Sequence, residues 1–143
     1  MLLKNETREL LNSIGLLIMR VWIGGVMFLK HGWPKLSSFS ERMDTFADPL
    51  GVGSTASLVM TISAEVGCAL LVVVGLGTRL ASAPLLFAML VAAFIVHGND
   101  PWQKQEFALL FGMTFLMLIF TGPGKFSLDH IVFKKYTERS TKR

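Results

Sequence analysis

Two charged residues lie inside long apolar stretches of the sequence. Glu65 is in the middle of the stretch Ser57–Gly77. Arg20 is near the middle of the stretch Leu10–Leu29. An unpaired charge in hydrocarbon costs roughly 3 kcal/mol or more, so an intramembrane acid normally faces other helices and has a partner. Two antiparallel helices joined by one loop bring their centres to the same depth, and we therefore predict a buried Arg20–Glu65 ion pair. Such a pair either serves chemistry or only fixes the register of the helices.

A second group of polar residues lies at the ends of the apolar stretches, and the expected topology brings its members to one membrane face: His31, Lys35, His97 and Glu106. Two imidazoles could bind a metal or bracket a haem. Both lie at the membrane edge, however, and no local spacing such as His-x-x-x-His supports ligation, so we predict no metal site and disfavour haem.

A quinone headgroup suits this group better than a metal does. A quinone ring needs one or two hydrogen-bond donors at its carbonyls and an apolar tunnel for its tail. We therefore treat the four residues as candidate ligand-binding residues and a quinone as the compatible cofactor. The simpler interpretation is that they are interfacial polar residues at ordinary helix ends. The sequence identifies no catalytic residue.

The elements that would position these residues are membrane-spanning helices. The chain has 143 residues, of which 52% are hydrophobic and 17% are charged. The apolar runs are continuous rather than alternating and are too long for strands, which favours helices over a β-barrel. We predict an all-α membrane protein, a four-transmembrane-helix bundle occupying residues 10–124. Its spans are expected at about 10–30, 55–77, 80–97 and 102–121.

Three segments lie outside the predicted spans. Residues 1–9 form a charged lead-in, and residues 125–143 form an amphipathic segment and basic tail. Gly32 and Pro34 are expected to end the first span. In the first outer loop, apolar residues of the stretch Ser37–Gly53 repeat at helical intervals, which predicts a short amphipathic helix over the mouth of the bundle.

The distribution of positive charge predicts the orientation of the chain. A net charge of +4 could indicate nucleic acid, but no soluble basic face is available to bind it. Most Lys and Arg residues lie on the side shared by the N-terminus, the second loop and the C-terminus. The positive-inside rule therefore places both termini in the cytoplasm, in a multi-pass protein of the plasma (inner) membrane. The first span is too long for the core of a secretory signal and should stay as an anchor.

Two kinds of small residue bear on packing and redox chemistry. Gly24 and Gly25 remove side-chain bulk beside Arg20, which would let a neighbouring helix approach closely. Cys68 is the single cysteine. One thiol forms no internal disulfide, so this chain alone cannot run thiol–disulfide exchange.

The order and spacing of several features resemble those of the DoxX family of small membrane proteins, from about Gly15 to Asp129. The features are the arginine of the first span, the sequence His31-Gly32-x-x-Lys35, Glu65 ahead of Gly75, the Gly-x-Gly-Thr-Arg turn at 75–79, His97 after an alanine-rich span, and Gly122-Pro123-Gly124 followed by Ser127-Leu128-Asp129. The resemblance implies a four-helix bundle and a redox association. Some relatives are named as subunits of a thiosulfate:quinone oxidoreductase, others are linked to complexes handling thiol or oxidative stress, and distant ones look like cargo receptors or assembly factors.

Three functions remain open on these grounds. The first is a membrane-embedded oxidoreductase component that binds a quinone-like molecule. The second is a non-enzymatic factor that assembles or scaffolds a membrane complex. The third is a small proton-coupled transporter that uses Glu65, which the predicted Arg20 partner argues against because a fixed cation keeps a carboxylate ionised. The expected partners are the lipid bilayer, a redox partner protein or membrane complex, and a second copy of the chain, with no nucleic acid.

Overall fold

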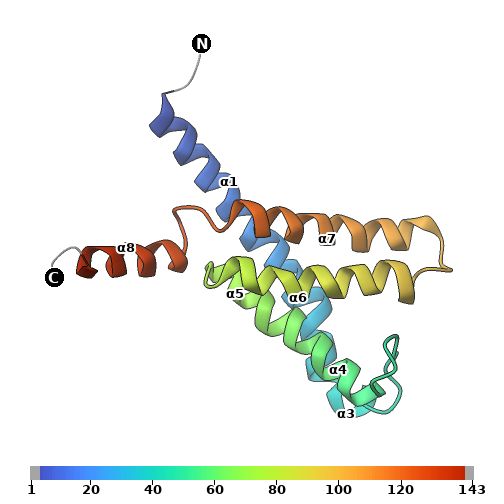
Figure 1. The fold of residues 1–143 in the computed structure, drawn as a ribbon. Helices are drawn as coiled ribbons and strands as arrows, with labels where there is room; N and C mark the ends of the chain where they lie inside the picture. Colours follow the sequence, from blue (N-terminus) through green and yellow to red (C-terminus); the bar gives the residue numbers. More distant parts are fainter. Residues whose placement is uncertain (1–3, 141–143) are drawn as a thin grey trace.

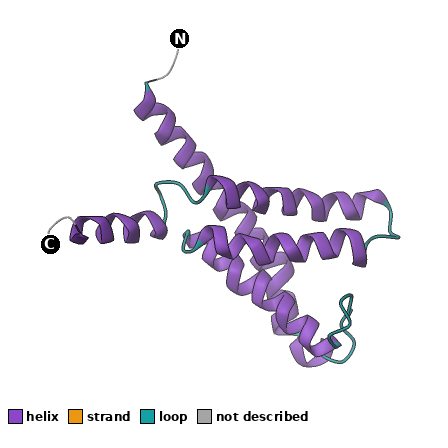
Figure 2. Cartoon of the chain, in the orientation of Figure 1, coloured by secondary structure: helices purple, strands orange, loops and turns teal. Residues whose placement is uncertain are grey.

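The protein is built from long membrane-spanning helices. The structure is a computed structural model that describes residues 4–140, with the side chains of residues 4–136. Four of its helices are long and apolar enough to cross a membrane: Asn5–Ser37, Ser54–Val74, Thr78–Val96 and Trp102–Thr121. Figure 2 shows that the described part of the chain contains helices and loops only. The predicted all-α, four-span architecture is therefore confirmed.

Each of the first three long helices contains a π-helical segment, marked η, in which backbone hydrogen bonds reach five residues along the chain instead of four. The first helix comprises α1 (Asn5–Val26), η1 (Met27–Gly32) and α2 (Trp33–Ser37). The second comprises α4 (Ser54–Ile62), η2 (Ser63–Cys68) and α5 (Ala69–Val74). The third comprises α6 (Thr78–Val91) and η3 (Ala92–Val96). The other helices are α3 (Phe39–Arg42), α7 (Trp102–Thr121) and α8 (Leu128–Ser140).

The long helices form two antiparallel pairs. The first and second helices pack together, and α6 packs along α7. In Figure 1 the two pairs cross at an angle and diverge toward the end that carries loops 38–53 and 97–101. The core lies where they cross, and Val72, Phe115 and Leu118 are fully buried there. This crossing leaves the two pairs separated at one end, and the candidate site is found there.

The opposite end of the bundle is closed by contacts between two distant segments. Gly75 and Gly77 adopt left-handed conformations with φ of 74° and 57°, which only glycine adopts at little cost. The Asp129 carboxylate accepts hydrogen bonds from the backbone N–H groups of Gly77 (2.7 Å) and Thr78 (3.1 Å). The Asp129 N–H in turn donates to the Gly75 carbonyl at 2.9 Å. The glycine turn and the Ser-Leu-Asp sequence that follows α7 are thus one structural unit, which caps the start of α6.

The first span does not end at Gly32 and Pro34 as predicted. The helix continues to Ser37, because η1 leads directly into α2 and Pro34 lies in the first turn of α2. A proline is tolerated in a first turn, where its missing N–H is not needed. The helix also begins earlier than expected, at Asn5, so most of the lead-in 1–9 is helical.

The segments outside the spans also differ from the prediction in extent. The expected helix over Ser37–Gly53 is limited to α3, and residues 43–53 form turns and bends. Gly51 and Gly53 have positive φ values, which place two left-handed residues in the turns just before α4. After α7, we predicted an amphipathic segment and a basic tail over residues 125–143. In the structure, helix α8 extends through most of this region to Ser140, and it projects away from the bundle in Figure 1. Residues 141–143 lie outside the described chain.

The two adjacent glycines of the first helix differ in their surroundings. A methyl group on Gly24 would lie 2.8 Å from the Val73 side chain and 2.9 Å from the Ala69 carbonyl oxygen. A methyl group on Gly25 would meet nothing within 4 Å. The predicted close approach is confirmed for Gly24 and is wrong for Gly25.

This difference gives a matched test of helix packing. Gly24→Ala should lower the unfolding temperature in detergent, because backbone atoms of α5 must move to admit the methyl group. Gly25→Ala should leave the temperature unchanged or raise it, since alanine favours a helix over glycine by about 1 kcal/mol. Equal changes in the two variants would contradict the observed packing.

Candidate functional site

A cleft of about 680 Å³ lies between the two diverging helix pairs. This volume is typical of small-molecule sites, which are mostly apolar with a few convergent polar groups. Most of its lining is apolar and comes from α4, η2, α6 and α7. Five charged or imidazole side chains line it: His31, Lys35 and Glu65 at the level of the middle of the second helix, and His97 and Lys104 at the end where the pairs separate.

The three π-helical segments all contribute to this cleft. His31 belongs to η1, Glu65 to η2, and Ala92 and Val96 to η3. A π-helical turn locally widens a helix and changes the direction of the residues that follow, and such turns occur frequently at functional sites. The irregular turns thus coincide with the polar end of the cleft.

The central contact of the cleft is an ion pair that the sequence analysis did not predict. Lys35 Nζ donates to Glu65 Oε2 at 2.6 Å and to the His31 carbonyl at 3.2 Å. The Glu65 side chain is 5% exposed and the Lys35 side chain is 20% exposed. A buried carboxylate therefore has one cationic partner, and both groups line the cleft.

The predicted Arg20–Glu65 ion pair is wrong. Arg20 is fully buried, but its guanidinium donates to the carbonyls of Val72 (3.2 Å), Val73 (3.3 Å) and Phe126. The first two acceptors are at the C-terminal end of α5, where carbonyls lack partners within the helix and carry partial negative charge. Arg20 thus holds the α7–α8 connection against α5, at the end of the bundle away from the cleft.

The register of the first two helices explains the error. A methyl group on Gly32 would lie 2.6 Å from the Glu65 carbonyl oxygen, and one on Gly24 would contact Ala69 and Val73. Glu65 is therefore level with the end of η1, and Arg20 is level with the turn after α5. The first helix is centred beside Arg20, but its N-terminal part extends beyond the end of α5 at Val74, and the assumption of matched centres therefore fails.

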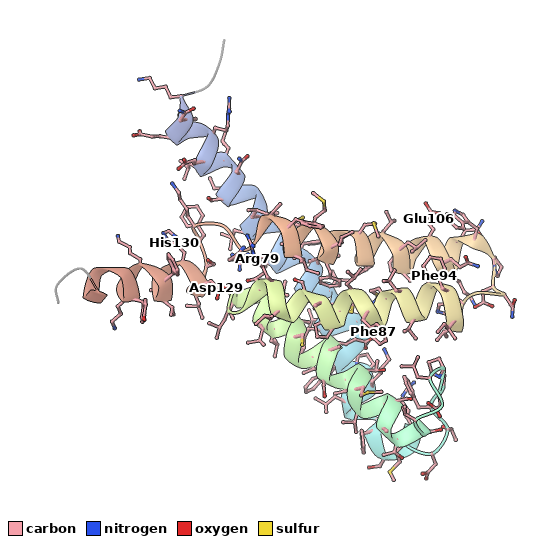
Figure 3. All side chains as sticks on the ribbon, viewed as in Figure 1. Arg79, Phe87, Phe94, Glu106, Asp129 and His130 are labelled. Atoms are coloured by element: carbon pink, nitrogen blue, oxygen red, sulfur yellow. The ribbon has the colours of Figure 1, made fainter. Side chains whose placement is uncertain are left out.

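The candidate residues at the outer end are only partly brought together. His31, Lys35 and His97 line the cleft, and the His31 ring packs edge-on against Phe111 with centroids 5.6 Å apart. Glu106 is exposed and does not line the cleft. Figure 3 shows Glu106 on the side of α7 that faces away from α6. Its proposed place in the site is therefore wrong, because the helical phase of α7 turns it outward.

Two residues that were not predicted join the site at its mouth. His97 Nδ1 lies 2.7 Å from Asp100 Oδ2, and Lys104 Nζ donates to the same oxygen at 3.2 Å. The hydrogen bonds from His97 and Lys104 lower the pKa of Asp100 below its ordinary value. The Asp100 carboxylate thereby orients the His97 ring. The spacing of Asp100 and Lys104, four residues apart at a helix start, was the available sequence signal.

Residues 43–53 lie over the outer end of the cleft, which Phe46, Pro49 and Leu50 line. Asp48 fastens this segment to the start of α4. Its carboxylate accepts hydrogen bonds from the Ser57 hydroxyl (2.7 Å) and from the N–H groups of Gly53 (2.7 Å) and Val52 (3.0 Å). These bonds, chiefly the one from Ser57, lower the pKa of Asp48.

The lowered pKa of Asp48 predicts release of this segment in acid. A carboxyl with a depressed folded-state pKa contributes stability above its unfolded value of about 3.9, and this contribution is lost as the pH falls through the lower folded value. Amide hydrogen exchange at Val52 and Gly53 should therefore increase below about pH 4 relative to the intrinsic rate. In Asp48→Asn the protection should be weak at every pH. Protection independent of Asp48 would contradict this role.

Within the described residues, no group of three or more His, Cys, Asp or Glu side chains is arranged to hold a metal ion. Cys68 is a free, half-buried thiol that lines the cleft below Glu65. The groups available for chemistry in the cleft include one ion pair, two imidazoles and one thiol, set in a large apolar surface.

Comparisons with known proteins are consistent with this architecture. The family model named DoxX matches residues 15–98. Inner membrane protein YqjF of Escherichia coli is 27% identical over 130 residues, covering 88% of this chain and 98% of that protein. A protein of Haemophilus influenzae described as uncharacterized is 34% identical over 116 residues, covering 76% of this chain and 84% of that protein. No solved structure matches significantly.

Proposed function

Because the chain belongs to the DoxX family of multi-pass membrane proteins, we propose that its cleft binds the ring of a quinone-like molecule, as the membrane-embedded component of an oxidoreductase. The observation that carries the proposal is the hydrogen-bonding cluster at the polar end of an otherwise apolar cleft of about 680 Å³. A quinone has the matching shape: a flat ring with carbonyl acceptors and an apolar tail.

The polar cluster supplies the groups that such a ring requires. Lys35 carries ammonium N–H donors, of which the structure occupies two, on Glu65 and on the His31 carbonyl. A third donor is available, since an ammonium has three N–H bonds. The His31 imidazole, in contact with Phe111, adds a second donor beside an aromatic surface. The hydrogen bond to Glu65 keeps the Lys35 ammonium group in place.

The same residues could transfer protons. Reduction of a quinone to a quinol consumes two electrons and two protons. The imidazole of His31 and the Lys35–Glu65 pair are acid–base groups within the cleft, and His97 stands at its mouth on Asp100. The electrons would come from a partner redox protein. With both termini in the cytoplasm, as the positive-inside rule predicts, the mouth would face outward.

The test is to measure quinone binding directly. Protein purified in mild detergent should bind a tail-free benzoquinone, measured by equilibrium dialysis, and its lipid extract should contain quinone by mass spectrometry. Lys35→Met should abolish the binding of the free ring. Glu106→Gln, which alters an exposed carboxylate outside the cleft, should bind like the unaltered protein. Binding that survives Lys35→Met would refute the site, and absence of binding by the unaltered protein would refute the function.

One observation favours a second candidate, a proton-coupled transporter. The objection to it depended on an arginine partner for Glu65, and the partner is a lysine instead. Lysine can release its proton in a protein, whereas arginine effectively cannot. A transporter would require Glu65 for substrate uptake by vesicles along a pH gradient. Uptake equal in Glu65→Gln and unaltered protein would remove this candidate.

A further inference from the structure

Side chains that line the cleft on the side where α4 faces α6 are about half exposed, and the cleft can open to the membrane there. Its walls there are Met60 of α4 and Phe87 of α6, whose side chains are 49% and 57% exposed, together with Val59 and Pro84. Figure 3 shows Phe87 on the side of α6 that faces α4. All four residues lie inside helices that span the membrane. Their exposed surfaces would therefore contact lipid rather than water.

We propose that this opening is a lateral portal, through which a lipid-dissolved amphiphile enters the cleft from the bilayer and through which its tail remains in the bilayer. This inference rests on the proposed function for the ring, and it adds the route of entry: a water-insoluble molecule with a long apolar tail reaches the cleft from within the bilayer. A soluble substrate would have no need of the portal.

The polarity of the cleft supports this direction of entry. Lys35 and Glu65 carry the charge at the level of η2, whereas Val59, Met60, Pro84 and Phe87 are all apolar. An amphiphile would therefore place its ring against Lys35 and its tail toward the portal, and no charged group would meet the tail. The outer end is covered in part by Phe46, Pro49 and Leu50. These residues make direct entry from water harder for an apolar molecule.

Access to the native thiol Cys68, which lines the cleft, tests the portal without any quinone. In lipid vesicles, a bilayer-soluble maleimide should alkylate Cys68 faster than a sulfonated, charged maleimide. Met60→Trp adds bulk at the portal and should slow alkylation by the bilayer-soluble reagent. Leu110→Trp is the matched control, because Leu110 is 60% exposed on α7 and does not line the cleft. An unchanged rate in Met60→Trp, or an equal rate with the charged reagent, would overturn the portal.

Binding of two quinones separates failure of the portal from failure of the ring site. Met60→Trp should lower the affinity for a decyl-tailed quinone much more than the affinity for the tail-free ring, while Leu110→Trp should change neither. Equal losses for both quinones would place Met60 in the ring site and overturn the portal. If unaltered protein binds neither quinone, the proposed function fails, and the thiol measurement still decides whether the cleft opens to lipid.

Discussion

Replacing Arg20 with methionine should destabilise the folded protein by about 3 kcal/mol or more, because hydrogen bonds to a charged donor contribute about 1.5–3 kcal/mol each and several are lost together. Arg20 is fully buried, and its guanidinium donates to Val72, Val73 and Phe126. Methionine fills much of the same space but donates no hydrogen bond, so the part-buried Val73 and Phe126 carbonyls lose this donor, while the Val72 carbonyl keeps the hydrogen bond from the Gly75 N–H. The measurement is the unfolding midpoint in mixed micelles of increasing denaturing detergent.

The effect should be local to the end of the bundle that Arg20 closes. Hydrogen exchange at Gly77 and Thr78 should rise, because the α7–α8 connection that presents the Asp129 carboxylate to their N–H groups is released. Arg79→Met is the control: it removes the same charge from an exposed position at the same end. If both substitutions shift the midpoint equally, the stabilising role of the Arg20 hydrogen bonds is disproved.

Lys35→Met should destabilise the protein more than Glu65→Gln does. Removing one partner of a buried pair leaves an uncompensated charge, which costs about 3–5 kcal/mol when the remaining group is fully buried. The Glu65 side chain is 5% exposed and cannot extend its carboxylate to water, whereas the Lys35 side chain is 20% exposed near a helix end. A lysine left unpaired there can extend its ammonium toward water at small cost.

The double variant Lys35→Met/Glu65→Gln completes a double-mutant cycle, which measures the coupling energy between the two residues. It removes both charges, so its stability should recover part of the loss caused by Lys35→Met alone, with a coupling energy of about 1–3 kcal/mol. Lys104→Met is a suitable control, because Lys104 lines the mouth of the same cleft but pairs with Asp100. Additive effects at Lys35 and Glu65 would show that the pair contributes no stability in the membrane.

The membrane spans were predictable because the length of an apolar run is a local property of the sequence. The register between the first and second helices could not be predicted in this way. It depends on how far each helix extends past the other, and the assumption of matched centres failed because the first helix extends well beyond the end of α5. The same error produced the false Arg20–Glu65 pair and hid the Lys35–Glu65 pair, although all three residues had been selected. Sequence patterns identified the charged residues correctly and assigned their partners incorrectly.

The candidate site was predictable as far as helix ends could be grouped by topology. His31, Lys35 and His97 lie at the ends of spans that converge on one face, and they line one cleft. Their function in binding stays a prediction. The prediction for Glu106 failed because the direction of its side chain depends on the helical phase of α7. This helix begins at Trp102, and its phase turns Glu106 to the outside. The lateral opening depends on the crossing of two helix pairs, which the sequence of each helix does not encode separately.

The three π-helical segments have a consequence for how this chain is compared with its relatives. A π-helical turn amounts to one residue inserted into an α-helix, and removing it would rotate everything beyond by about 100°, the angle per residue of an α-helix. A homologous protein one residue shorter within η1 would present a different neighbour of Lys35 to the cleft. Aligning the cleft residues of such a relative with those of this chain would therefore require a single-residue gap inside a helix, where gaps are ordinarily penalised most.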